Sequence, residues 1–121
     1  FAKDHLLPRI RKPILINIIP VRGLLEKTGV YGDCMDEEDR EFTIRIDTKL
    51  PIIDMVTTLL HEMVHVQQYV TGRLKCTRPR EFIFEKTTYR HDMDYDSRPW
   101  EIEAWKKEKQ LKELYYGNFR N

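Results

Sequence analysis

The stretch Leu59-Leu60-His61-Glu62-Met63-Val64-His65 carries the pattern H-E-x-x-H inside a run that is patterned as a helix. On an α-helix, His61 and His65 lie one turn apart, about 6 Å along the axis and about 40° around it, so both imidazoles can reach one cation. This spacing suits a tetrahedral Zn²⁺ ion. Glu62 lies beside the pair, where it can take a proton from a water held on the metal instead of binding the metal itself. The stretch therefore predicts two zinc ligands and a general base.

The surrounding residues predict that this motif lies on an amphipathic helix from about Ile52 to Val70. Apolar residues recur at spacings of three and four and define one buried stripe: Ile53, Val56, Leu59, Leu60, Met63, Val64 and Val70. The other face carries Asp54, Thr57, Thr58, His61, His65 and Gln68. Pro51 and Gly72 bracket the run with the expected start and stop signals. Three matched positions alone would also fit a surface helix with solvated histidines, but two histidines on the polar face of an anchored helix favour a site.

A catalytic zinc needs a third protein ligand, and a second predicted helix from Pro99 to about Tyr116 offers candidates in its acidic first turn. Position 71, where a metzincin would carry a third histidine, is Thr, so that class is excluded. Glu101 and Glu103 are two residues apart and point about 160° from each other on a helix, so only one can face the metal.

Glu101-Ile102-Glu103-Ala104 gives the chain a second motif in the later helix, and with it the sequence resembles the gluzincin metallopeptidases. In that family, H-E-x-x-H is completed by E-x-x-A, usually followed by Asp or Asn; Trp105 stands in that last position here. The resemblance covers roughly residues 40 to 108 and is closest to minimal domains, including SprT-like and phage-type peptidase domains. It implies Glu101 as the third zinc ligand, a peptide or protein substrate, and zinc-dependent endopeptidase activity with Glu62 as the base.

Polar residues just before the second helix approach it from the metal side. His91 and Tyr95 are candidates for hydrogen bonds to a developing oxyanion, and His91 is also an alternative metal ligand if neither glutamate serves. A loop that only spans the gap would need neither residue.

The predicted strands indicate an α+β fold. The β-branched run Ile14 to Ile19 predicts a strand buried inside the sheet, and Phe82 begins a further strand that ends near Tyr89. Residues 41–47 predict the second strand of a hairpin behind a polar turn, with Phe42, Ile44 and Ile46 facing the core and Thr43, Arg45 and Asp47 facing out. We expect one small, mostly antiparallel sheet packed on the metal helix. The second helix should close the site, as in a zincin-like domain, with residues 41–47 as the edge that pairs with substrate.

Size and charge set limits on the other function classes. The chain has 121 residues, 40% of them hydrophobic, which suits a single domain over residues 1–121. A net charge of +1 compels neither a nucleic-acid nor a membrane partner, and no apolar run approaches the roughly 20 residues of a spanning helix. Two cysteines and no recognisable signal peptide favour reduced thiols and a cytoplasmic location.

A basic segment at residues 73–80 leaves one alternative function open. The protein could be a non-catalytic binding module stapled by a metal, with weak nucleic-acid binding through this segment. Glu62 favours hydrolysis, because a structural zinc site has no need of an acid between its histidines.

Overall fold

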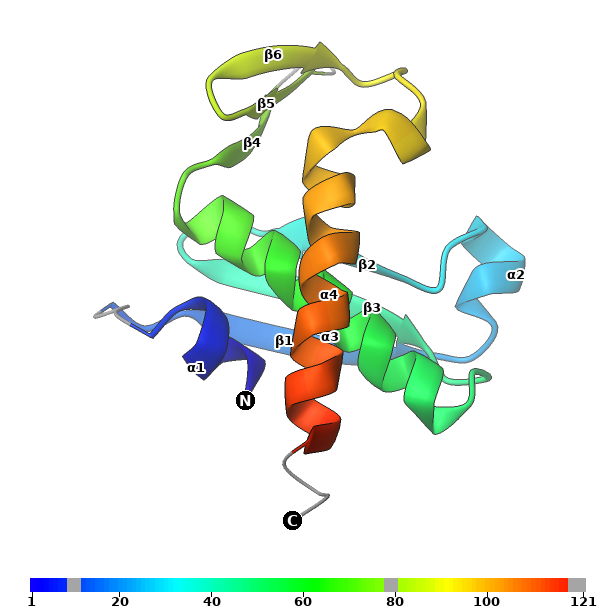
Figure 1. Ribbon diagram of the computed structural model, residues 1–121. Helices are drawn as coiled ribbons and strands as arrows, with labels where there is room; N and C mark the ends of the chain where they lie inside the picture. Colours follow the sequence, from blue (N-terminus) through cyan, green and yellow to red (C-terminus); the bar gives the residue numbers. More distant parts are fainter. Residues whose placement is uncertain (9–11, 78–80, 118–121) are drawn as a thin grey trace.

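The computed structural model describes residues 1–8, 12–77 and 81–117, and it has an α+β fold with two small sheets (Figure 1). Its strands are β1 (Leu15–Val21), β2 (Gly32–Asp36), β3 (Glu41–Asp47), β4 (Leu74–Thr77), β5 (Glu81–Phe84) and β6 (Thr87–Arg90). Its helices are α1 (Ala2–Leu6), α2 (Leu24–Thr28), α3 (Ile52–Val70) and α4 (Pro99–Gly117), with a 3-10 turn, η1, at Tyr95–Ser97. Both long helices confirm the prediction from periodicity and flanking prolines. Within the described residues, no helix is both long and apolar enough to cross a membrane.

The first sheet has the order β1-β3-β2, with β1 parallel and β2 antiparallel to β3. Two predictions are therefore wrong: β3, expected at the edge, is the central strand, and β1, expected inside the sheet, lies at an edge. Leu15 is 57% exposed and Ile18 is 53% exposed. Pro20 fits this position, because a residue without an N–H suits an edge strand.

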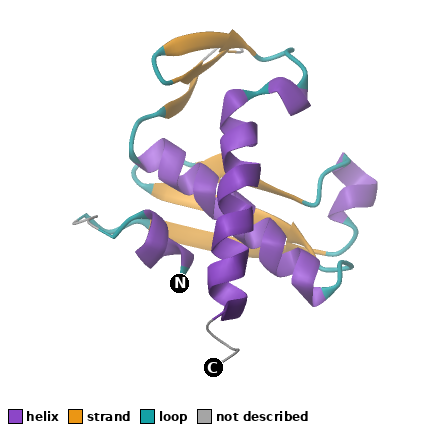
Figure 2. Ribbon diagram, in the orientation of Figure 1, coloured by secondary structure: helices purple, strands orange, loops and turns teal. Residues whose placement is uncertain are grey.

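The first sheet, α3 and α4 form successive layers, with α3 packed between the sheet and α4 (Figure 2). The core between sheet and helix contains Phe42, Ile44, Ile46, Met63 and Val66. On its other side, α3 contributes Leu60 and Val64 to a cluster with Ala104 and Leu111 of α4. Ile53, predicted in the buried stripe, is 48% exposed in the first turn of α3.

Asp47 at the end of β3 was predicted to face solvent and is instead 2% exposed. Its carboxylate accepts hydrogen bonds from the backbone amides of Gly23, Leu25 and Lys49, at 3.0, 2.9 and 2.9 Å. The hydrogen bonds from Leu25 and Lys49 are the main reason why the pKa of Asp47 is lowered. Asp47 thereby fixes α2 to the sheet. Thr43, also predicted outward, is buried as well.

The second sheet, β4-β5-β6, is antiparallel throughout and lies beside the first turns of α4 (Figure 1). The single strand predicted from Phe82 to Tyr89 is a hairpin that turns at Glu85 and Lys86, both with positive φ. Phe84 and Trp100 pack together beneath it. The predicted basic segment at residues 73–80 is partly β4, and its residues 78–80 lie outside the described residues, as do residues 9–11.

Candidate metal centre

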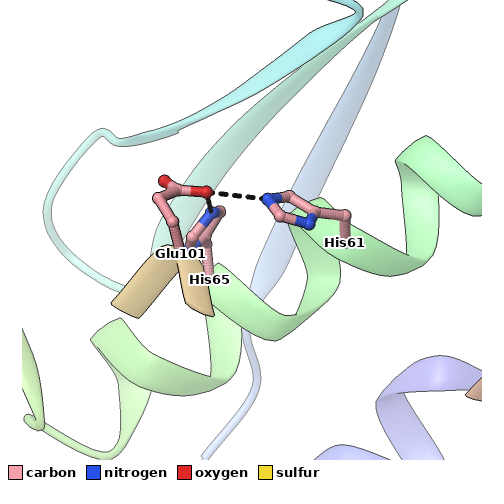
Figure 3. Close-up of side chains that lie close together, drawn as sticks. All are labelled: His61, His65 and Glu101. Carbon is pink, nitrogen blue, oxygen red and sulfur yellow. Dashed lines mark hydrogen bonds and ion pairs between the residues drawn. The ribbon is translucent and has the colours of Figure 1, made fainter. Parts of the chain in front are cut away.

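Three buried side chains from the two long helices meet at one point (Figure 3). His61 and His65 come from the polar face of α3, and Glu101 comes from the first turn of α4, which begins at Pro99. Ala104, one turn further along α4, is fully buried against α3. A small residue there lets the two helices approach closely, which places Glu101 over the histidines.

The distances fit a tetrahedral metal. Glu101 Oε1 lies 2.9 Å from His61 Nε2 and 3.1 Å from His65 Nε2, and the ligand atoms of the three residues lie within 4.8 Å of one another. Tetrahedral bonds of about 2.0–2.1 Å would separate two ligand atoms by about 3.3 Å, so a slight opening of the cluster would admit zinc. This His, His and Glu group could hold a metal ion.

In both His61 and His65, Nδ1 has an acceptor nearby, and this contact determines that Nε2 is the nitrogen left to bind a metal. Gln68 Oε1 lies 2.8 Å from His65 Nδ1, while Gln68 Nε2 donates to the carbonyl of Trp100 at 3.0 Å and to Glu103 at 2.9 Å. The amide can therefore only accept from His65, which makes Nδ1 the protonated nitrogen and leaves the Nε2 lone pair for a metal.

Glu108 plays the corresponding part for His61: its Oε2 lies 3.4 Å from Nδ1 of His61 and can pair with the proton of that nitrogen. If both rings are neutral, two Nε2 lone pairs and a carboxylate oxygen face one another, which is repulsive unless a cation lies between them. The donor set therefore fits a metal.

Without a metal, protons are the available cations. Burial lowers the pKa of His61, but hydrogen bonds to Glu101 and Glu108 and the charges of Glu62 and Glu101 outweigh it and raise that pKa to about 10. Burial likewise opposes the charge of Glu101, but its hydrogen bonds to both histidines hold its pKa well below the ordinary value. A metal must displace these protons, so binding should release them and weaken in acid.

Glu62 is 5% exposed and lies between His61 and His65 in the sequence of α3. Burial raises its pKa to about 7, against the opposing charges of His65 and His61. A carboxylate that titrates near neutral pH is suited to take up and release a proton in one reaction cycle.

Two hollows meet at Glu62. The larger hollow, of about 590 Å³, is lined by Leu25, Gly29, Val30, Tyr31, Gly32, Asp54, Thr57, Thr58, His61, Glu62, Tyr95, Trp105 and Glu108. The smaller hollow, of about 160 Å³, is lined by Val30, Gly32, Asp33, Cys34, Glu62, His65, Tyr69, Leu74, Phe82, Tyr95, Arg98, Trp100 and Glu101. His61 faces the first, while His65 and Glu101 face the second. The group of His61, His65 and Glu101 therefore contributes to the walls of both hollows.

Gly32 brings strand β2 against α3 at this junction. A Cβ atom at position 32 would lie 2.5 Å from Thr58 Cγ2 and 2.8 Å from the carbonyl oxygen of Arg45. Real Cβ atoms do not approach other atoms so closely, and the carbonyl cannot move aside without disturbing β3. Glycine is therefore needed here because of close packing.

The other predicted site residues have different positions. Tyr95 is in the site, and its hydroxyl donates to Glu101 Oε1 at 3.0 Å. Glu103 is paired with Gln68 and with the guanidinium of Arg73, away from the three ligands. His91 is exposed, and its ring stacks on that of Phe82 with the centroids 5.5 Å apart. Neither Glu103 nor His91 is part of the group formed by His61, His65 and Glu101.

Gln68 and Glu108 contact the two histidines, and the sequence had not indicated a role in the site for either of them. Gln68 lies three residues after His65, and Glu108 lies seven after Glu101, which puts each pair on one face of its helix. These helical spacings were the feature of the sequence that could have indicated that Gln68 and Glu108 lie near the site.

The chain matches no protein-family model, and no curated protein and no solved structure gives a match to it.

Proposed function

We propose that the protein is a zinc-dependent endopeptidase of the gluzincin type. The observation that carries this proposal is the convergence of His61, His65 and Glu101 on one point beside the buried carboxylate of Glu62, at the junction of two open hollows. A metal that only stapled the fold would need neither a base beside its ligands nor a cavity.

The chemistry divides between the metal and the residues around it. Bound zinc supplies the positive charge that polarises a peptide carbonyl and lowers the pKa of water toward about 7. Glu62 accepts the proton of the attacking water and delivers it to the leaving amine. Burial and the charge of Glu101 raise the pKa of Tyr95, so its hydroxyl stays protonated and can donate to the carbonyl oxygen as that oxygen gains charge.

Strand β2 is the part of the first sheet that can hold an extended peptide. It pairs with β3 on one side only within the described residues, and its residues Gly32, Asp33 and Cys34 line the smaller hollow. A peptide added at this edge would gain backbone hydrogen bonds and cross the cluster. β2 thus takes the role that residues 41–47 were expected to have.

The substitution Glu62→Gln tests the chemistry, because glutamine keeps the size of the side chain but cannot accept the proton. We expect this variant to keep its zinc and its fold and to lose about 10²-fold or more of the peptidase activity. Activity is measured on peptide libraries and on a denatured protein, with zinc content measured in parallel. Cleavage by the variant at the wild-type rate and equal zinc content would show that Glu62 is not the base.

The nucleic-acid alternative receives less support from the basic segment. Arg73 pairs with both Glu85 and Glu103, so its charge is already neutralised. Lys75 lies on the four-residue strand β4 and lines neither of the two hollows described above. We therefore regard any contact with nucleic acid as secondary.

A further inference from the structure

Carboxylates predominate among the charged groups in the wall of the larger hollow, where, among the described residues, His61, one of the three proposed metal ligands, is the group that can carry positive charge. Three of its lining residues are acidic, namely Asp54, Glu62 and Glu108, and no lysine or arginine lines it in the part of the chain that the structure describes. A cleft lined by one sign of charge concentrates the field inside it and attracts the opposite charge. A bound divalent metal does not cancel this charge, because Glu101 adds a fourth carboxylate beside it.

Two of these carboxylates lack a partner. No described residue hydrogen-bonds to or ion-pairs with the side chain of Asp54, which is exposed at the start of α3. The same holds for Glu62, although it is more than nine-tenths buried. Both carboxylates line the hollow, so a cationic ligand there could pair with them.

An aromatic wall stands beside the carboxylates. Trp105 packs edge-on against Tyr95, with ring centroids 6.0 Å apart, and lies 6.1 Å from the ring of His61. Trp105 is partly exposed, so one part of its ring is open to a ligand. A long aliphatic side chain that ends in a cation can pack its stem on such a ring while its charge reaches a carboxylate.

The smaller hollow has a different character. It contains Arg98, whose guanidinium carbon lies 5.2 Å from the ring of Phe82 and 5.8 Å from that of Trp100. The smaller hollow is also lined by Asp33, Glu62 and Glu101. Arg98 offsets part of this negative charge, and a cationic side chain would meet its guanidinium as a like charge. The two sides of the junction at Glu62 therefore favour different side chains.

We infer that the larger hollow takes a lysine or arginine side chain of a peptide, so that the substrates are peptides with a basic residue on one side of the cleaved bond. This inference rests on the proposed peptidase function and names its substrate class.

The test measures binding separately from cleavage. The zinc-loaded Glu62→Gln variant, which lacks the charge of Glu62 but keeps Asp54 and Glu108 in the hollow, is titrated by calorimetry with alanine-rich nonapeptides. Each peptide carries one guest residue, Lys, Leu or Glu, which is placed at each position in turn. We expect the best Lys peptide to bind about tenfold more tightly than its Leu counterpart, and the Glu peptide to bind most weakly.

Two variants, one inside the hollow and one outside it, replace an acidic residue by lysine and test whether the charge of the hollow causes the preference. Asp54→Lys, made in the same background, should remove most of the preference for Lys. Glu113→Lys makes the same change at an exposed position of α4 outside the hollow and should leave the preference intact. Equal binding of Leu and Lys peptides, no binding of any peptide, or a preference unchanged by Asp54→Lys would each overturn the inference.

Failure of the inference and failure of the proposed function give different results. Cleavage by the wild type with no preference for a basic residue would refute the inference and leave the peptidase assignment standing. A preference for Lys in binding, with no cleavage by the zinc-loaded wild type, would refute the peptidase assignment and leave the basic-peptide site standing.

Discussion

Glu101 and Glu103 lie two residues apart on α4, and their partners separate their roles. Glu101 Oε1 meets both histidines and the hydroxyl of Tyr95. Glu103 is held by Arg73 through two guanidinium nitrogens, a planar geometry that matches a carboxylate. It would have to give up that pair to turn toward a metal. Of the two glutamates, Glu101 is therefore the one that lies with the histidines in the group that could hold a metal ion.

Zinc content distinguishes the two glutamates. We expect the wild type and Glu103→Ala each to retain one zinc ion per chain after dialysis, and Glu101→Ala to lose it, as measured by atomic emission. Circular dichroism of all three proteins shows whether a loss of zinc reflects unfolding. The opposite pattern would transfer the role to Glu103, and full zinc in both variants would remove both glutamates from the site.

Because the pKa of Glu62 is raised, we expect this residue to lower the free energy of unfolding of the metal-free protein as pH increases. A carboxyl group whose pKa is higher in the folded state than in the unfolded state supports folding below about 4.5 and loses that support as pH rises through about 7. Metal-free Glu62→Gln should therefore be more stable than metal-free wild type at pH 8, by roughly 3 kcal/mol, and similar to it at pH 4.5.

Chemical denaturation of both proteins across this pH range measures the difference. Its dependence on pH reports the titration of Glu62 together with its effect on the two histidines, because the charge of Glu62 raises the pKa of both. A difference that stays constant from pH 4.5 to pH 8 would mean that Glu62 is not desolvated in the folded protein.

At the scale of elements, the close approach of β2 and α3 at Gly32 shapes both hollows. Gly32→Ala should destabilise the protein by about 1–3 kcal/mol, because the added methyl group overlaps Thr58 and the backbone of Arg45. Gly117→Ala is the control, since no atom lies within 4 Å of a Cβ atom there. Urea denaturation compares the two, and equal stabilities would show that β2 can move away from the helix freely.

The sequence predicted the long helices well and the strand order poorly. Periodicity and flanking prolines are local signals, and they placed α3 and α4 within about a residue of their observed ends. The position of β1 depends on which strand it pairs with, and its partner β3 begins 26 residues after Leu15. No local pattern encodes that choice, although Pro20 was a sign of an edge. The turn at Glu85 and Lys86 was missed because neither residue is a usual turn former.

The site was predicted to the extent that a single helix encodes it. His61, Glu62 and His65 follow from one spacing, whereas Glu101 required a resemblance to a known pattern. The contact between His65 and Gln68 lies within α3. The hydrogen bond from Gln68 to the Trp100 carbonyl and the contact between Glu108 and His61, however, exist only once α3 and α4 are packed. Their roles therefore could not be read from either segment alone.

For the whole molecule, charge argues against nucleic acid as the main partner. The net charge is +1, the larger hollow is acidic, and Arg73 is paired within the fold. We expect only weak, salt-sensitive binding to single- and double-stranded DNA, with dissociation constants of about 10⁻⁴ to 10⁻⁶ M near physiological salt. Fluorescence anisotropy at two salt concentrations measures it, and sub-micromolar binding that survives physiological salt would favour the binding-module alternative.

The anchoring of α2 by Asp47 also bears on how the molecule moves. Leu25, Gly29 and Val30, in and just after α2, form part of the wall of the larger hollow, while a single carboxylate holds the amides of Gly23, Leu25 and Lys49. Because these amides share one acceptor, they lose protection against hydrogen exchange together when that acceptor swings away. We therefore expect the amides of Gly23, Leu25 and Lys49 to exchange together, and Asp47→Asn to speed their exchange more than that of the amides in α3 and α4.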